Sequence, residues 1–135
     1  MPVNPSLAGR TFPATEPYEV SREKIAEFAR ATGCTFDGSS APATFPIVVA
    51  FPAMNALIAD PDTGMALHRV VHGEQRFTHS RPVVPGDQLV VVLSVESLRQ
   101  IAGADIIGTR SEITDAEGEH VCTALATLVH RGEES

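Results

Sequence analysis

The chain has 135 residues, a hydrophobic content of 43% and a formal net charge of −7 at pH 7, which suits one domain with a substantial hydrophobic core. The acidic balance argues against non-specific binding to nucleic acid or to an anionic membrane, because both need a basic face. Aromatic residues are few and tryptophan is absent, so we expect a core built mainly of Val, Ile, Leu and Ala.

The N-terminal part predicts one amphipathic helix after an irregular beginning. Residues 1–17 are rich in proline and small residues, and residues 17–20 could form a short strand. Ser21 is a good N-cap, apolar side chains then recur at helical spacing, and Gly33 stands where a helix would stop. We expect a helix over residues 21–32.

A long apolar stretch, Ala43 to Ala59, predicts a second helix. Thr44 could cap it, and Pro46 is acceptable in a first helical turn. The stretch is apolar nearly all round, which indicates a helix enclosed by other structure. Pro52 lies near the middle and should kink or break the helix, because proline removes a hydrogen bond and clashes with the preceding turn.

The second half of the chain has the character of β-strands. Gly73 predicts a bulge or bend in the first strand, and the last strand is apolar or small on both faces, as is typical of a central strand covered on both sides. The predicted strands cover residues 67–80, 88–98, 105–114 and 119–130, with turn signals at 82–87, 102–103 and 115–118. Two helices followed by at least four antiparallel strands make an α+β domain that spans residues 1–135.

The most specific motif is Val71-His72-Gly73-Glu74-Gln75-Arg76-Phe77, followed by Ser80-Arg81-Pro82-Val83 and then Gly86-Asp87. This ordered set resembles the His-Gly-Glu-Gln segment and the Arg-Pro…Gly-Asp turn of MaoC-like acyl-thioester dehydratases and hydratases. More narrowly, it is similar to the non-catalytic N-terminal half of (R)-specific enoyl-CoA hydratases and to the substrate-binding subunit of actinobacterial (3R)-hydroxyacyl-ACP dehydratases. Residues 18–29, 42–45 and 105–107 also match stretches of those subunits.

The resemblance implies a hotdog fold, in which an antiparallel sheet wraps around a long central helix. It implies that an acyl-CoA or acyl-ACP thioester binds in a tunnel along that helix, where the expected distortion at Pro52 would affect the tunnel's shape, and it implies no cofactor. It also implies pairing with a homologous catalytic hotdog subunit or with a second copy, because hotdog domains of this family join their sheets. The substrate-binding residues that we expect are His72, Gly73, Gln75, Thr44 and Phe45.

The catalytic signature of the family does not carry over to this chain. That signature is an Asp and a His before the central helix, in a segment like Asp-x-Asn-Pro-x-His. Dehydration of a 3-hydroxyacyl thioester needs such a positioned carboxylate and imidazole to remove one proton and deliver another. The corresponding stretch, residues 33–40, contains no His and only Asp37, and it is short, as though an overhanging loop were missing. We therefore expect no catalytic residue here.

Two other functions remain open from the sequence. One is an independent hotdog enzyme, a thioesterase or a hydratase, with an unusual acid/base set drawn from Asp37, His72 and Glu74. The other is a non-enzymatic dimer that binds acyl-CoA or acyl-ACP. A plainer interpretation of the motif also stands: His72 would be satisfied by a neighbouring backbone group, Gln75 and Arg76 would lie on a solvated strand face, and residues 81–87 would be only a turn.

The sequence gives little support for a metal site, a catalytic thiol or a membrane segment. Cys34 and Cys122 lie far apart without a CxxC or His/Cys cluster, which argues against a zinc site. A disulfide between them stays open from the sequence, and two free thiols in a reducing cytosol are the simpler interpretation. Cys34 with His72 or His79 as its base is a possible nucleophile, but an inert thiol is favoured. The first ten residues lack a signal-peptide pattern, and no apolar run approaches the ~20 residues of a spanning helix. We expect a cytoplasmic protein.

Overall fold

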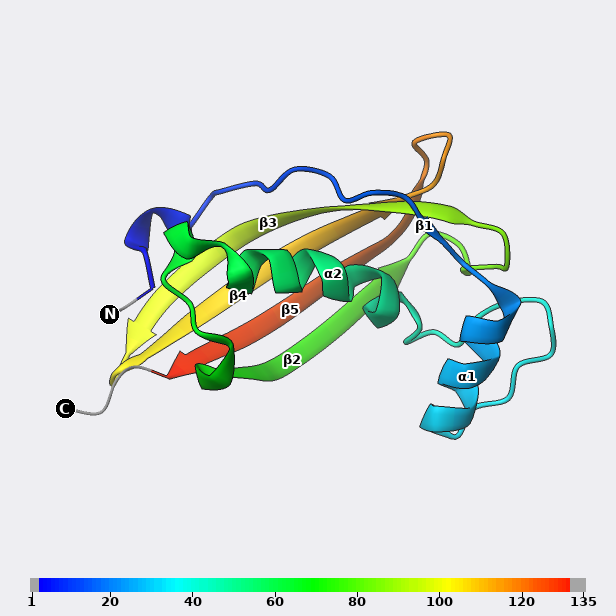
Figure 1. The fold of residues 1–135 in the computed structure, drawn as a ribbon, viewed down its shortest axis with the longest axis horizontal. Helices are drawn as coiled ribbons and strands as arrows, with labels where there is room; N and C mark the ends of the chain where they lie inside the picture. The colour runs from blue at the N-terminus through cyan, green and yellow to red at the C-terminus, as the bar shows by residue number, and fades with distance from the viewer. Residues whose placement is uncertain (1–2, 132–135) are drawn as a thin grey trace.

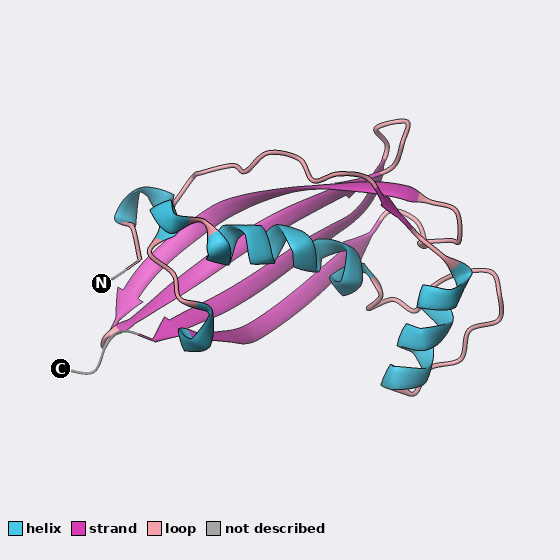
Figure 2. Cartoon of the chain, in the orientation of Figure 1, coloured by secondary structure: helices cyan, strands magenta, loops and turns pink. Residues whose placement is uncertain are grey.

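A computed structural model describes residues 3–131. One antiparallel sheet has the strand order β1-β3-β4-β5-β2, and helix α2 crosses one face of it (Figures 1 and 2). The helices are α1 (Arg22–Thr32) and α2 (Pro46–Ala59), and the strands are β1 (Tyr18–Glu19), β2 (Val70–His79), β3 (Gln88–Ile101), β4 (Ala104–Thr114) and β5 (His120–Arg131). A sheet wrapped around a central helix is the α+β arrangement that the sequence predicts.

Helix α1 forms where the sequence predicts it, with both ends capped as expected. The Ser21 hydroxyl accepts a hydrogen bond from the backbone N–H of Lys24 at 3.0 Å. Gly33 ends the helix with a φ of 76°, a left-handed conformation that glycine adopts without strain. Ile25 and Ala29 bury one face of the helix.

Helix α2 lays one face on the sheet, and it begins later than the sequence predicts. Its buried side chains recur at helical spacing: Pro46, Val49, Ala50, Ala53, Met54 and Leu57. The predicted cap at Thr44 is wrong, because the chain is already turning before the helix starts. Phe45 has helical backbone angles and donates its N–H to the carbonyl of Pro42, while the carbonyl of Thr44 accepts from Ile47.

The helix continues through Pro52 without a break, so the predicted break is wrong. Pro52 lies on the exposed side of α2, where water can hydrate the carbonyl of Val48 that the missing N–H would have bonded. A kink without a break stays a prediction. The sequence predicts that other structure encloses this helix. In the single chain only the sheet-facing side of α2 is covered, because Phe51 on its outer side is 50% exposed.

Buried and more exposed side chains alternate along the first half of β3. On β3, Leu89, Val91, Leu93 and Val95 are all buried, as the two-residue period of a strand requires. The two central strands, β4 and β5, bring smaller side chains to the same face, which lets a helix approach the sheet closely. These are Thr109, Ser111, Ala124 and Ala126.

The two edges of the sheet differ. The N-terminal segment runs along β3 (Figure 1) and hydrogen-bonds to it, with the N–H groups of Gly9, Phe12 and Thr15 donating to carbonyls of that strand. Strand β2 forms the opposite edge, and within residues 3–131 no further strand pairs with it. A ten-residue open edge exposes unpaired backbone groups and is a ready template for another chain.

A buried polar cluster joins the N-terminal segment and the chain before β2 to the sheet. Asp105 accepts the backbone N–H of Val3 at 3.1 Å, and Nε2 of His130 accepts that of Ala66 at 3.0 Å. The other ring nitrogen of His130 lies 3.7 Å from the Asp105 carboxylate and has no hydrogen-bond partner within the described chain. Burial lowers the pKa of His130 from its ordinary value, against the opposing attraction of Asp105.

Candidate functional site

A β-bulge at Gly73 aligns two polar side chains of β2. The pairing register of β2 against β5 shifts between His72 and Glu74, so the alternation of side chains slips by one residue. His72 pairs with Leu128 and Gln75 with Ala126, and both partners belong to the hydrophobic core beneath α2. The predicted bulge is therefore confirmed, and it places His72 and Gln75 on the same, core-facing side of the strand.

His72 and Gln75 are also bonded to each other. The Nε2 atom of His72 lies 2.9 Å from the side-chain oxygen of Gln75. Because a carbonyl oxygen only accepts, Nε2 carries the proton and donates it, and Nδ1 of the neutral ring keeps a free lone pair. The pair therefore offers a ring acceptor and an amide group to a ligand.

These residues line a hollow of about 420 Å³ between the start of α2 and the edge strand β2. The structure brings four of the five predicted substrate-binding residues to it: Thr44, His72, Gly73 and Gln75. The remaining lining residues are Ile47, Glu74 and Phe77. The hollow thus has one apolar side chain from α2 and one from β2, beside polar groups of β2 and of the segment that enters α2, which suits an apolar ligand that carries polar functions.

The structure does not bring Phe45 to this hollow. Its side chain is fully buried and packs edge-on against Phe28, with ring centroids 5.5 Å apart. Phe45 holds α1 to the start of α2, so its contribution to the hollow is indirect.

The acid/base set of Asp37, His72 and Glu74 is not assembled. Asp37 accepts hydrogen bonds from the N–H and hydroxyl of Ser39 in its own loop, and these bonds lower its pKa below the ordinary value. Glu74 borders the hollow but pairs with Arg76 at 3.2 Å, and both residues point to the outer side of the sheet. Among residues 3–131, one histidine and no carboxylate paired with it face the hollow, so these residues offer hydrogen-bonding groups but no acid/base pair for proton transfer.

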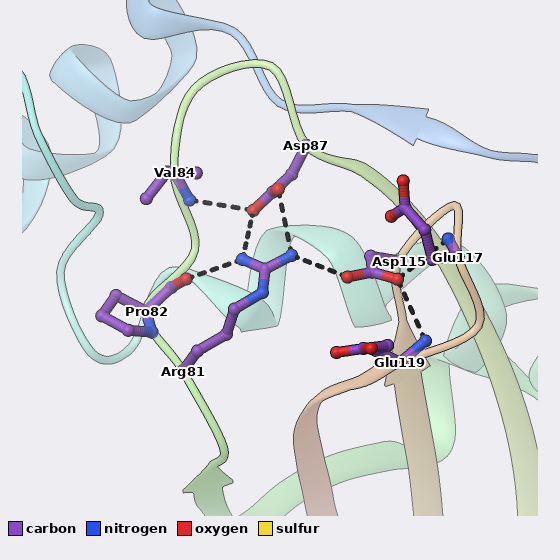
Figure 3. A network of polar contacts seen from close by, with 7 residues as sticks. All are labelled: Arg81, Pro82, Val84, Asp87, Asp115, Glu117 and Glu119. Carbon is purple, nitrogen blue, oxygen red and sulfur yellow. Dashed lines mark hydrogen bonds and ion pairs between the residues drawn. The ribbon is translucent and has the colours of Figure 1, made fainter.

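The Arg81…Asp87 motif builds a turn (Figure 3). Arg81 forms a two-pronged ion pair with Asp87 at 2.9 and 3.1 Å, and the same carboxylate accepts the N–H of Val84. Gly86 adopts a φ of 92°, which glycine tolerates without strain. The interpretation of residues 81–87 as a turn agrees with this geometry.

Arg81 also ties this turn to the β4–β5 hairpin. Its second nitrogen lies 3.2 Å from Asp115, whose other oxygen accepts the N–H groups of Glu117 and Glu119 (Figure 3). The backbone hydrogen bond from Glu119 is the main reason that the pKa of Asp115 is lowered, and the bonds to Asp87 raise that of Arg81. Arg81 is thus a structural cation between two carboxylates.

A second hollow of about 400 Å³ adjoins this turn, and sequence reasoning did not single it out. It is lined by Ser40, Ala41, Ala43, His79, Ser80, Arg81 and Pro82. The Nε2–H of His79 donates to the carbonyl of Ala43 at 2.8 Å, which joins the end of β2 to the segment that enters α2. The only sequence signal for it is position, since His79 and Ser80 directly follow the β2 motif.

The cysteines take no part in either hollow. Both are free; Cys34 is exposed, whereas Cys122 is buried in the core. Burial raises the pKa of the Cys122 thiol to about 11, so it is protonated and unreactive at neutral pH. Residues 3–131 contain no group of three or more His, Cys, Asp or Glu side chains that could hold a metal ion, and their helices are too short or too polar to cross a membrane.

Comparison with known proteins gives one consistent picture. Residues 6–124 match the family model described as the FAS1-like dehydratase domain region. A UPF0336 protein from Leifsonia xyli subsp. xyli is 47% identical over 148 aligned positions, which cover 99% of each chain. That alignment is longer than this chain, so the relative has residues that this chain lacks.

Two solved structures are similar over nearly the whole chain. In the HadBC (3R-hydroxyacyl-ACP dehydratase) complex from Mycobacterium tuberculosis, one chain superposes with a TM-score of 0.80 at 30% identity, covering 91% of this chain and 96% of that one. A MaoC-like dehydratase superposes with a TM-score of 0.79 at 28% identity, covering 94% of this chain and 43% of that one. This chain therefore matches nearly all of one chain in the first structure, which is of a C-terminally truncated complex, and less than half of the second chain.

Proposed function

The chain belongs to the MaoC-like hotdog dehydratase family, among the UPF0336 proteins, and from that membership we propose that it is an acyl-thioester-binding subunit of an (R)-specific 3-hydroxyacyl dehydratase or enoyl hydratase. In this proposal a homologous subunit supplies the catalytic Asp and His. The substrate is an acyl-CoA or acyl-ACP, and the assembly works in the cytoplasm.

The observation that carries the proposal is a hollow equipped to bind but not to transfer protons. His72 and Gln75 present hydrogen-bonding groups to it, and Ile47 and Phe77 line it with apolar surface. Among the residues that the structure describes, no carboxylate is paired with that histidine, whose partner is Gln75. A dehydratase-family domain with this hollow and without the acid/base pair suits a binding role beside an active homologue.

The polar pair would orient the thioester end of the substrate. A thioester carbonyl or the adjacent amide can accept from the Gln75 amide group, and an amide N–H can donate to Nδ1 of His72. The acyl chain would follow the apolar wall beneath α2. In the single chain the His72 side chain is exposed and Gln75 is half-buried. Once a partner and a ligand cover them, an unpaired amide or imidazole would cost about 1–3 kcal/mol, which favours a ligand with matching polar atoms.

The place for the partner is the open edge of β2 together with the outer side of α2. The edge presents ten residues of strand, and Phe51 on the helix is half exposed beside Pro52. A homologous hotdog domain could extend the sheet across this edge and cover the helix. The dehydratase from Mycobacterium tuberculosis to which this chain is similar is described as a complex, which supports such pairing.

A homodimer that binds acyl thioesters without catalysis is the second candidate. The same open edge and the same hollow favour it, since a second copy would fit where a homologous subunit fits. The stand-alone enzyme is disfavoured, because Asp37 and Glu74 are engaged elsewhere.

Photo-crosslinking tests the proposal directly. A trans-2-enoyl thioester with a diazirine in its acyl chain is bound to the chain in its assembled state, irradiated, and mapped by mass spectrometry. We expect labelling of the peptide that carries His72 to Phe77 and of the start of α2, with competition by unmodified thioester. Labelling confined to the partner subunit, or insensitive to competitor, would contradict the binding role.

A further inference from the structure

A buried histidine lies where three strands meet the chain that leads into β2. His130 is on β5, and its neighbours across the sheet are Val70 at the start of β2 and Asp105 on β4. The His130 side chain is only 2% exposed. Neither of the two hollows is lined by it, so the proposed thioester site leaves this titratable group without a role.

The hydrogen bond from Ala66 fixes the protonation state of the His130 ring. A backbone N–H only donates, so Nε2 of His130, 3.0 Å from the nitrogen of Ala66, accepts with its lone pair. The one proton of the neutral ring then lies on Nδ1. This atom faces the Asp105 carboxylate at 3.7 Å, which is too long for a hydrogen bond, and it has no other partner within residues 3–131.

A second proton reverses the role of Nε2. The imidazolium carries an N–H on both nitrogens, so Nε2–H and the N–H of Ala66 would point at each other as two donors. The positive charge also draws Nδ1–H toward Asp105, and a movement of roughly 1 Å brings the two within charge-assisted hydrogen-bonding distance. The carboxylate is held in place there by the N–H of Val3 at 3.1 Å. Protonation therefore exchanges the bond to Ala66 for a bond to Asp105.

The surroundings of the ring decide where this exchange occurs on the pH scale. Among the described residues, Asp105 on β4 favours the imidazolium, whereas Arg69 in the 3-10 turn before β2 opposes it. Burial is the largest effect, and it lowers the pKa of His130 from its ordinary value. The ring is therefore neutral at neutral pH, and the exchange needs acid below about pH 6.5.

The part of the chain that Ala66 anchors joins α2 to β2 (Figure 1). We call residues 64–69 the connecting segment. Inside it, the N–H of Arg69 donates to the carbonyl of Ala66 at 2.9 Å, which is a local contact, whereas the bond from Ala66 to His130 joins the segment to β5. Leu67, the next residue, is 68% exposed, so its side chain adds little packing. Loss of the Ala66 bond therefore loosens the segment just before β2 begins.

We propose that His130 is a proton-sensitive latch, in which the neutral ring holds the connecting segment at Ala66 and the imidazolium turns to Asp105 and releases it. The latch acts on the beginning of the strand that carries His72 and Gln75, because the connecting segment continues directly into β2. It involves no ligand and no second subunit, so it stands or fails independently of the proposed function.

Hydrogen exchange at the Ala66 amide tests the latch. The full chain, labelled with nitrogen-15, is followed by NMR from pH 8 to pH 5, and exchange is expressed as a protection factor so that its intrinsic dependence on pH is removed. His130→Gln keeps an acceptor for Ala66 but does not titrate, and Asp105→Asn keeps an acceptor for Val3 without the charge. His68→Gln, which removes an exposed histidine from the connecting segment, is the matched control.

Each variant has its own expected pattern. In the parent and in His68→Gln, protection of the Ala66 amide falls about two- to tenfold as the His130 ring titrates, while the amide of Ile107 in the central strand β4 keeps its protection. In His130→Gln the protection of Ala66 does not change with pH. Asp105→Asn moves the midpoint of the change to lower pH, because the charge that favours the imidazolium is gone.

Three results would overturn the latch. The first is a His130 ring that titrates, as seen in its Cε1 proton shift, while protection of Ala66 stays constant, or a ring that does not titrate down to pH 5. The second is equal loss of protection at Ala66 and Ile107, which shows unfolding of the whole domain and no separate release of the segment. The third is the parent's pH dependence persisting in His130→Gln, which assigns the effect to another group.

Discussion

The imidazole of His72 and the side-chain amide of Gln75 meet at 2.9 Å, although they stand three positions apart on a β-strand. In a regular strand such residues point to opposite faces. The bulge between His72 and Glu74 removes that opposition. An added Cβ at Gly73 would meet only ordinary contacts, at 3.5 Å from the carbonyl of Thr127 and 3.6 Å from Val129, so the space around it does not demand glycine.

We predict that His72→Ala and Gln75→Ala each weaken acyl-thioester binding by the assembled protein about two- to tenfold, because each removes one hydrogen-bonding group from the hollow. Isothermal titration measures the affinity. Arg76→Ala is the matched control, since Arg76 lies on the same strand but points to the outer side. Normal folding with unchanged affinity in both variants would show that the motif only shapes the sheet.

The ion pairs of Arg81 with Asp87 and Asp115 predict that replacing Arg81 lowers the stability of the fold. Arg81→Met leaves Asp87 and Asp115 without their shared cation, so we expect the free energy of unfolding to fall by about 1–3 kcal/mol. Urea denaturation monitored by circular dichroism measures it. Arg99→Met, which removes an exposed arginine on β3, should change stability by less than about 0.5 kcal/mol; an equal loss in both variants would refute the role of Arg81.

Burial of His130 predicts that the protein loses stability in mild acid. The pKa of His130 is lower in the folded protein than in the unfolded chain. Below about pH 6.5 this imidazole therefore binds a proton in the unfolded chain more readily than in the folded protein. The contribution is complete above pH 6.5 and declines as the pH falls toward the folded pKa. Asp105, which favours the charged ring, and Arg69, which opposes it, also act on the group.

Denaturation of the parent and of His130→Gln between pH 8 and pH 5 tests this prediction. Glutamine can still accept from Ala66 but does not titrate. We expect the parent to lose more stability than the variant over this range. Parallel pH profiles would show that His130 does not titrate differently in the two states.

The open edge of β2 and the exposed side of α2 predict association with another hotdog domain. Phe51 and Ile101 are almost equally exposed, at 50% and 51%, but only Phe51 lies on the expected interface; Ile101 ends β3 at the far hairpin. We predict that Phe51→Asp weakens association at least tenfold and that Ile101→Asp does not. Sedimentation velocity distinguishes them; a parent chain that stays monomeric at tens of micromolar, alone and with a homologous subunit, would contradict the interface.

The elements that could be predicted from the sequence are those whose signals are local. Ser21 and Gly33 mark the ends of α1 by their own hydrogen-bonding and backbone preferences, and Gly73 marks the bulge. The sequence motif around His72 also contains most of the residues that line the first hollow.

The rest depends on contacts between distant segments. Pro52 does not break α2 because it faces solvent, and the strand order that makes β2 an edge decides which face is open. The resemblance of residues 42–45 to the start of the family's central helix predicts both Thr44 and Phe45 as substrate-binding residues, yet Phe45 is buried in the core while Thr44 lines the hollow. The second hollow joins residues 40–43 to residues 79–82, and no local pattern predicts that meeting.

The most direct test of the account is the hydration rate of crotonyl-CoA by the isolated chain, compared with the chain assembled with a homologous hotdog subunit that carries the Asp/His pair. General acid–base groups contribute about 10²- to 10⁴-fold each. We predict no hydration above background by the isolated chain, and a rate in the assembly that is lost when the partner's Asp or His is replaced. Robust turnover by the isolated chain would contradict the account.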